Sequence, residues 1–224
     1  IFYKKIDNFK FDPIPELINL VEANKFSFLY ESVEKGREKG RYTICGYKAI
    51  KTIQLDKNKL RIDYSKKKQI INNPLVKIDE LIKKLKFKKH QELPPMAGAF
   101  FGYLSYENIH KIENISNFKK VNKLKTPDVI LFIPKTLIIF DNLTKSLFIL
   151  KHFLSKDSKN HKYETAVKEI NNIENRLSVK FSKNIIKFNK KKKLKIKSNI
   201  KKSKFLKNIK IAKSYIKNGD IFQV

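Results

Sequence analysis

Residues 129–150 read VILFIPKTLIIFDNLTKSLFIL and contain three short apolar runs. Runs of this length and composition predict strands over residues 129–133, 136–140 and 146–150. The polar sequence Asp-Asn-Leu-Thr at 141–144 is typical of a turn and separates the last two runs. Because two strands joined by so short a turn pair antiparallel, this segment predicts an antiparallel sheet.

Helices and strands are interspersed over the rest of the chain. Apolar residues at helical spacing predict helices, and short β-rich apolar runs predict further strands. The expected helices span residues 13–24, 75–85, 161–177 and 203–218, and the expected strands span residues 26–31, 41–47, 50–55, 59–64 and 97–104. We therefore expect an α+β fold with largely antiparallel sheets flanked by helices.

The composition changes near the end of the chain. Residues 182–202 have the least globular composition and include four consecutive lysines at 190–193, so we expect a linker or an extended surface strand there. The chain starts without Met and without a signal peptide, and it ends inside the apolar run 221–224. From these two ends we expect a piece of a longer protein.

The formal net charge of +30 normally points to a nucleic-acid or membrane partner. However, only four of the 51 basic residues are Arg, the side chain that reads bases through its bidentate fork. We interpret the lysine excess as the result of an AT-rich genome, although a basic nucleic-acid-binding module remains the alternative from a different class. The single cysteine, Cys45, excludes a disulfide framework, so we expect a reducing cytoplasm.

Polar residues at the end of one apolar strand are the strongest binding candidates. Glu31 and Ser32 follow the run 26–30, where a carboxylate and a hydroxyl could receive the amine of a ligand. Arg41 or Lys39 could then cover the ligand carboxylate. The alternative is an ion pair and a cap that merely end the strand.

Four motifs, in order along the chain, together resemble anthranilate synthase component I, the large subunit within the chorismate-binding enzymes. The opening motif is FLYESVE at 28–34 with GRYTICG at 40–46, and the second is PPMAGAFFGYLSYE at 94–107. The third is Pro-Asp at 127–128 with Ile-Phe-Asp at 139–141, and the last is IKNGDIFQV at 216–224.

The resemblance implies the family's N-terminal domain over residues 1–178, a lysine-rich linker or edge segment over 179–202, and the incomplete start of the chorismate-binding domain over 203–224. It also implies a lyase that converts chorismate and ammonia to anthranilate and pyruvate, the first step of tryptophan biosynthesis. Ammonia would come from a glutamine amidotransferase subunit. The Mg²⁺ ligands and catalytic His would lie beyond residue 224, so we expect this piece alone to be inactive.

The resemblance assigns roles to four residues. Tryptophan, the feedback inhibitor, would contact Glu31, Ser32 and Arg41. Gln223 stands where water-adding relatives have a lysine base, so it predicts ammonia as the nucleophile, the alternative being an ordinary strand residue. A near alternative is the large subunit of 4-amino-4-deoxychorismate synthase. Within this family we expect neither nucleic acid nor a membrane as a partner.

Overall fold

The computed structural model describes residues 1–31, 40–63, 69–85, 90–113, 125–153, 159–179 and 197–223. The chain divides into two compact units, residues 1–182 and residues 183–224, which are taken here in turn. The lysine run at 190–193 and the predicted site residue Ser32 lie outside the described residues.

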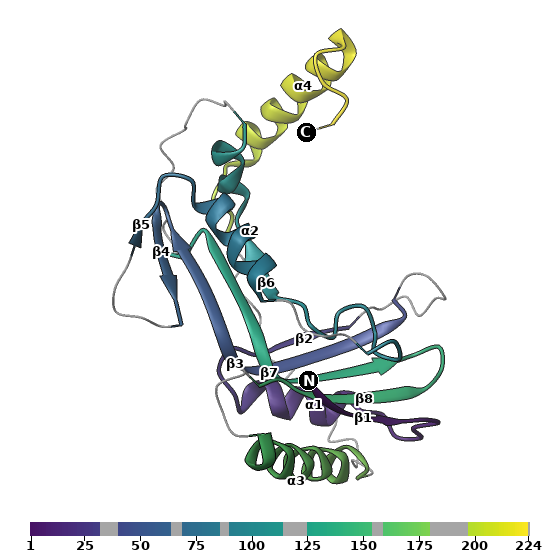
Figure 1. The fold of residues 1–224 in the computed structure, drawn as a ribbon. Coiled ribbons are helices and arrows are strands. Elements are labelled where there is room, and N and C mark those ends of the chain that lie inside the picture. The colour runs from purple at the N-terminus through teal and green to yellow at the C-terminus, as the bar shows by residue number, and fades with distance from the viewer. Residues whose placement is uncertain are drawn as a thin grey trace. The chain divides into compact units, whose positions relative to one another are not determined.

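The first unit is an eight-stranded sheet with helices packed against it (Figure 1). Every strand pair in the described residues is antiparallel, which confirms the predicted α+β fold with largely antiparallel strands. The strands are β1 (Phe2–Ile6), β2 (Phe28–Tyr30), β3 (Tyr42–Asp56), β4 (Lys59–Ile62), β5 (Gln69–Ile70), β6 (Phe101–Leu104), β7 (Val129–Asp141) and β8 (Ser146–Lys151). The helices are α1 (Ile14–Glu22), α2 (Pro74–Lys84), the 3₁₀ turn η1 (Tyr106–Lys111) and α3 (Lys159–Leu177).

Two long strands, β3 and β7, pair along their whole length and carry the rest of the sheet. One end of this pair is flanked by β2 on one side and by β8 and β1 on the other, and we call this the first sheet half. The other end is flanked by β4 and β5 and by β6, which form the second sheet half. The two halves therefore share β3 and β7.

Each long strand was expected as two shorter ones. The register of the β3–β7 pair shifts between Ala49 and Lys51, and Pro134 lies opposite Ala49 at this bulge. A proline has no N–H to donate, so a sheet tolerates it at a bulge where the ladder is already interrupted. Pro134 therefore marks the irregularity in β7 without ending the strand.

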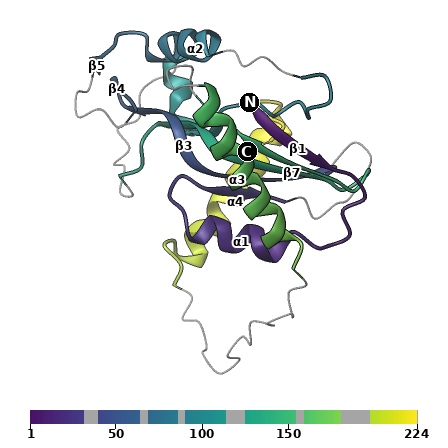
Figure 2. The same cartoon turned by 60° about the horizontal axis from the view of Figure 1, so that its bottom comes forward.

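The first sheet half is buried on both faces. Helices α1 and α3 cover one face, and both come forward in Figure 2. The residues of this core include Leu17, Leu20, Cys45, Tyr47, Ile138, Phe140, Leu147, Ile149, Ile170, Ile173 and Leu177. Leu93 and Ala97 cover the opposite face, packing near Leu137 and Phe148. Burial on both sides explains why β8 is apolar at successive positions rather than at alternate ones.

Ion pairs attach α3 to the elements beneath it. Glu169 pairs with Lys151 of β8, Glu174 pairs with Lys4 of β1, and Arg176 pairs with Glu16 of α1. These contacts add to the apolar packing of Ile170 and Ile173. Helix α3 is therefore held over the first sheet half by charges as well as by its apolar face.

The second unit contains helix α4 (Lys202–Asn218). It ends at Gly219, whose φ of 80° is the left-handed conformation that favours glycine at this position, as the sequence predicts. Several of its apolar side chains are exposed, including Phe205, Ile209 and Ile216. In the described part of the chain, no helix combines the length and apolarity needed to cross a membrane.

Candidate functional site

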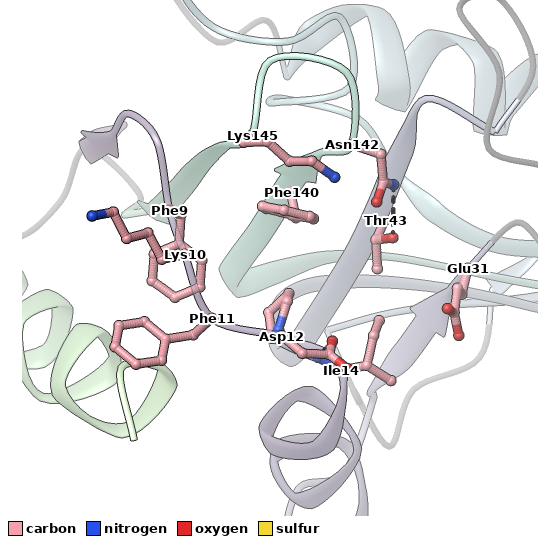
Figure 3. Close-up of a pocket in the computed structure, with 11 residues that line it drawn as sticks. Phe9, Lys10, Phe11, Asp12, Ile14, Glu31, Thr43, Phe140, Asn142 and Lys145 are labelled. Carbon is pink, nitrogen blue, oxygen red and sulfur yellow. Dashed lines mark hydrogen bonds between the residues drawn. The ribbon is translucent and has the colours of Figure 1, made fainter. Parts of the chain in front are cut away.

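A pocket of about 270 Å³ opens at the end of the first sheet half (Figure 3). Its volume lies just below the range of about 300–1,000 Å³ that is usual for small-molecule sites. The connection from β1 to α1, the end of β2, the start of β3 and the β7–β8 turn all contribute to it. The lining residues are Phe9, Lys10, Phe11, Asp12, Pro13, Ile14, Glu31, Thr43, Phe140, Asn142 and Lys145.

Aromatic rings form one wall of the pocket. The ring of Phe9 meets that of Phe11 edge-on at 5.7 Å between centroids and that of Phe140 at 6.3 Å. The backbone N–H of Phe9 donates to the carbonyl of Lys145 at 2.8 Å, which fixes this wall against the β7–β8 turn. The wall therefore offers an apolar surface suited to a flat ring.

Charges of both signs surround this wall. Glu31 and Asp12 supply carboxylates, and Lys10 and Lys145 supply ammonium groups. The Asp12 carboxylate accepts a hydrogen bond from the backbone N–H of Ile14 at 3.1 Å, so it is fixed at the start of α1. The four charged side chains nominally cancel, a balance that suits a zwitterion better than an ion of one sign.

Asn142 connects the β7–β8 turn to β3. Its side-chain amide N–H donates to the hydroxyl of Thr43 at 3.2 Å, drawn as a dashed line in Figure 3. Its backbone N–H donates to the carbonyl of Arg41 at 2.8 Å. These two bonds leave the amide oxygen of Asn142 as an acceptor at the pocket.

Arg41 does not line the pocket, and its guanidinium binds Asp141. Nη2 lies 2.7 Å from Oδ2, and Nε lies 3.1 Å from each carboxylate oxygen. The Asp141 carboxylate also accepts from the backbone N–H groups of Leu143 and Thr144. Burial acts to raise the pKa of Asp141, but these hydrogen bonds outweigh it and hold the pKa below its usual value.

The predicted site residues that the structure describes have different surroundings. Glu31 lines the pocket, Arg41 lies outside it in a pair with Asp141, and Gln223 is exposed in the second unit. Nothing in the sequence groups Glu31 with Phe9 or Lys145, because these residues belong to distant segments. The only local signal was the turn at 141–144, which predicts exposed polar groups without saying what they face.

The described residues support neither a metal site nor a reactive cysteine. No group of three or more His, Cys, Asp or Glu side chains there is placed to hold a metal ion, so the described residues do not fit a Mg²⁺ site. Cys45 is buried, and burial raises the pKa of its thiol to about 12. A thiol with that pKa is protonated at neutral pH and is a poor nucleophile.

Comparisons with known proteins point to one family. The model of the family described as chorismate binding enzyme matches residues 25–224. Anthranilate synthase component 1 of Acetivibrio thermocellus is 29% identical over 215 residues, covering 93% of this chain and 43% of the relative. The protein of the same name from Acinetobacter calcoaceticus is 29% identical and covers 88% of this chain and 40% of its own length. This chain thus spans less than half of either relative.

A solved structure supports the fold. The crystal structure of anthranilate synthase component I from Streptococcus pneumoniae TIGR4 superposes with a TM-score of 0.59 at 24% identity. The match covers 93% of this chain and 44% of the solved chain. At this identity the likeness concerns the arrangement of helices and strands.

Proposed function

Because this chain belongs to the chorismate-binding enzyme family, we propose that it forms the N-terminal part of an anthranilate synthase component I. The complete enzyme would convert chorismate and ammonia to anthranilate, pyruvate and water. A glutamine amidotransferase subunit would supply the ammonia. The relatives support this choice over a 4-amino-4-deoxychorismate synthase subunit or a nucleic-acid-binding module, because they are described as anthranilate synthase component 1.

Apart from Gln223, the described residues of this chain would contribute regulation rather than the chemical step. The described residues do not fit Mg²⁺, so we derive no step that uses the metal from them. Gln223 would favour ammonia over water, because a neutral amide cannot act as the base that activates water. The candidate regulatory site among the described residues is the pocket at the end of the first sheet half.

We assign this pocket to the inhibitor tryptophan. The observation that carries the assignment is the place of Glu31, which lines a pocket that combines an aromatic wall with charges of both signs. An amino acid is a zwitterion and carries both charges, whereas chorismate is a dianion and would meet the carboxylates of Glu31 and Asp12. Charge therefore favours the amino acid over the substrate as the occupant.

The roles within the pocket follow from chemistry. The Glu31 carboxylate would accept hydrogen bonds from the α-ammonium group, and the indole ring would lie against Phe140 and Phe9. Ser32 would add a hydroxyl beside Glu31. A direct contact from Arg41 would require its guanidinium to leave Asp141, so the sequence-based role of Arg41 stays a prediction.

Calorimetric titration of the chain with L-tryptophan tests the proposal. We expect saturable binding that Glu31→Gln weakens about tenfold or more, because a charge-assisted hydrogen bond is lost. Glu22→Gln is the matched control, since Glu22 is exposed near the end of α1 and does not line the pocket. Absence of tryptophan binding, or equal weakening by both substitutions, would contradict the assignment.

A further inference from the structure

Lys145 has an uncommon backbone for a lysine. It ends the β7–β8 turn with a φ of 56°, in the left-handed region that glycine and asparagine adopt most readily. Its carbonyl accepts the hydrogen bond from Phe9 described above, which holds this conformation in place. Lys48, Lys57 and Lys125 share this conformation, so the backbone fixes the position of the Lys145 side chain but does not by itself assign it a role.

The side chain of Lys145 reaches over the aromatic wall. Its Nζ lies 5.7 Å from the ring centroid of Phe140, and Figure 3 shows the side chain extending above that ring. In the same view Lys10 extends away from Phe140. Lys145 is therefore the lysine of the lining whose ammonium group lies above the surface proposed for the ring of the ligand.

Lys145 also has no acidic partner among the residues that the structure describes. Among the ion pairs of the described residues, none includes Lys145, whereas Lys4, Lys51 and Lys151 of the sheet are each paired with a carboxylate. Arg41 is bound to Asp141 through both Nε and Nη2. Within the described part of the pocket region, Lys145 is thus better placed than Arg41 to receive an anionic group.

We propose that Lys145 is the residue that receives the α-carboxylate of the amino acid in this pocket. The assignment rests on the proposed function and adds the second charged contact to it. Glu31 would hold the ammonium group, Lys145 the carboxylate, and the ring would lie against the aromatic wall of Phe140 and Phe9. Recognition would then require both charged groups of the ligand, which makes the pocket selective for a free amino acid.

Three ligands separate the two charged contacts. L-Tryptophan carries both groups, tryptamine lacks the carboxylate, and indole-3-propionate lacks the amine. We expect Lys145→Gly to weaken the binding of tryptophan and of indole-3-propionate about tenfold or more. The affinity for tryptamine should change by no more than about twofold. Glu31→Gln should instead weaken the binding of tryptamine and leave the binding of indole-3-propionate nearly unchanged.

Glycine is chosen because it suits the backbone of residue 145, so the variant should fold. Lys57→Gly is the matched control, because Lys57 has the same φ of 56° in the β3–β4 turn and does not line the pocket. Both glycine variants should melt at or slightly above the temperature of the unsubstituted chain, because the left-handed strain is relieved. Only Lys145→Gly should change ligand affinity.

The outcomes distinguish the proposal from its premise. If the unsubstituted chain binds tryptophan and Lys145→Gly binds it equally well, the carboxylate assignment is overturned while the proposed pocket stands. If Lys145→Gly weakens tryptamine as much as tryptophan, Lys145 acts through pocket shape and the assignment is again overturned. If the unsubstituted chain binds no tryptophan, the proposed function fails and the assignment fails with it.

Discussion

The guanidinium of Arg41, immediately before β3, binds the carboxylate of Asp141, the last residue of β7, with 2.7 Å between Nη2 and Oδ2. The Asp141 side chain is 4% exposed and that of Arg41 is 35% exposed, so the carboxylate depends on its protein partners far more than the cation does. The same carboxylate holds the backbone of the turn that carries Asn142 and Lys145. The pair thus links the two longest strands and supports one side of the pocket.

Asp141→Asn should destabilise the first unit by about 2 kcal/mol. The amide keeps the size of the side chain but removes the charge that Arg41 and the turn amides contact. Urea unfolding monitored by circular dichroism measures the change. Asp79→Asn is the control, because Asp79 forms an exposed pair with Lys83 on α2 and should change stability by less than about 0.5 kcal/mol. Equal effects of the two substitutions would mean that the buried carboxylate of Asp141 stabilises the fold no more than the exposed carboxylate of Asp79 does.

The same carboxylate predicts how stability depends on pH. Its pKa in the fold is lowered from 3.8, so the unfolded chain binds a proton more readily than the folded chain does. The stabilisation is therefore complete above the unfolded pKa and is lost as the pH falls through the lower, folded pKa. The melting temperatures of the unsubstituted chain and Asp141→Asn should differ by a constant amount down to about pH 5 and converge below about pH 4. A constant difference throughout the acid range would contradict the shifted pKa.

A second buried charge should respond asymmetrically to substitution. The Lys151 side chain is 3% exposed, pairs with Glu169 of α3 and donates to the Thr136 hydroxyl at 2.6 Å. Burial lowers the pKa of Lys151, while Glu169 acts to raise it. Glu169→Gln leaves this buried ammonium group without its carboxylate, and we expect a loss of about 2–3 kcal/mol.

Lys151→Met should lower the free energy of unfolding less than Glu169→Gln does. We expect its stability to stay within about 1.5 kcal/mol of the unsubstituted chain. Methionine fills a similar volume, and Glu169 is 37% exposed and keeps Lys135 as a partner. Urea unfolding of both variants under the same conditions shows which substitution lowers the free energy of unfolding more. The opposite order would show that the Lys151 ammonium group stabilises the fold beyond neutralising Glu169.

Short-range patterns account for the parts of the fold that the sequence predicts. The turn at 141–144 lies between β7 and β8, and the glycine at 219 ends α4, because both features depend on neighbouring residues. The small residues expected at a close approach in 97–104 include Gly102, where an added Cβ would lie 1.9 Å from the carbonyl oxygen of Ile130. Each of these features can be predicted from neighbouring residues alone.

The features of the fold and the site that the sequence does not predict depend on pairings between residues far apart in the chain. The continuity of β7 through Pro134 depends on the bulge opposite Ala49, and neither residue alone indicates it. Arg41 and Asp141 are separated by 100 positions, so a single sequence could not show that Arg41 is already bound. Glu31 was found because it ends an apolar strand, whereas Lys145 was indistinguishable from the other lysines until the turn placed it over Phe140.

Arg41→Gln decides whether Arg41 supports the pocket from behind or contacts the ligand. The substitution removes the guanidinium from Asp141 and should lower stability about as much as Asp141→Asn does, because both break the same pair. If Arg41 only supports the β7–β8 turn, the affinity for tryptophan should stay within about threefold when it is measured well below the melting transition. The double variant Arg41→Gln/Asp141→Asn should then bind tryptophan as Arg41→Gln does. A loss of about tenfold or more in Arg41→Gln that Asp141→Asn does not share would instead show that Arg41 leaves Asp141 and contacts the inhibitor, as the sequence motif predicts.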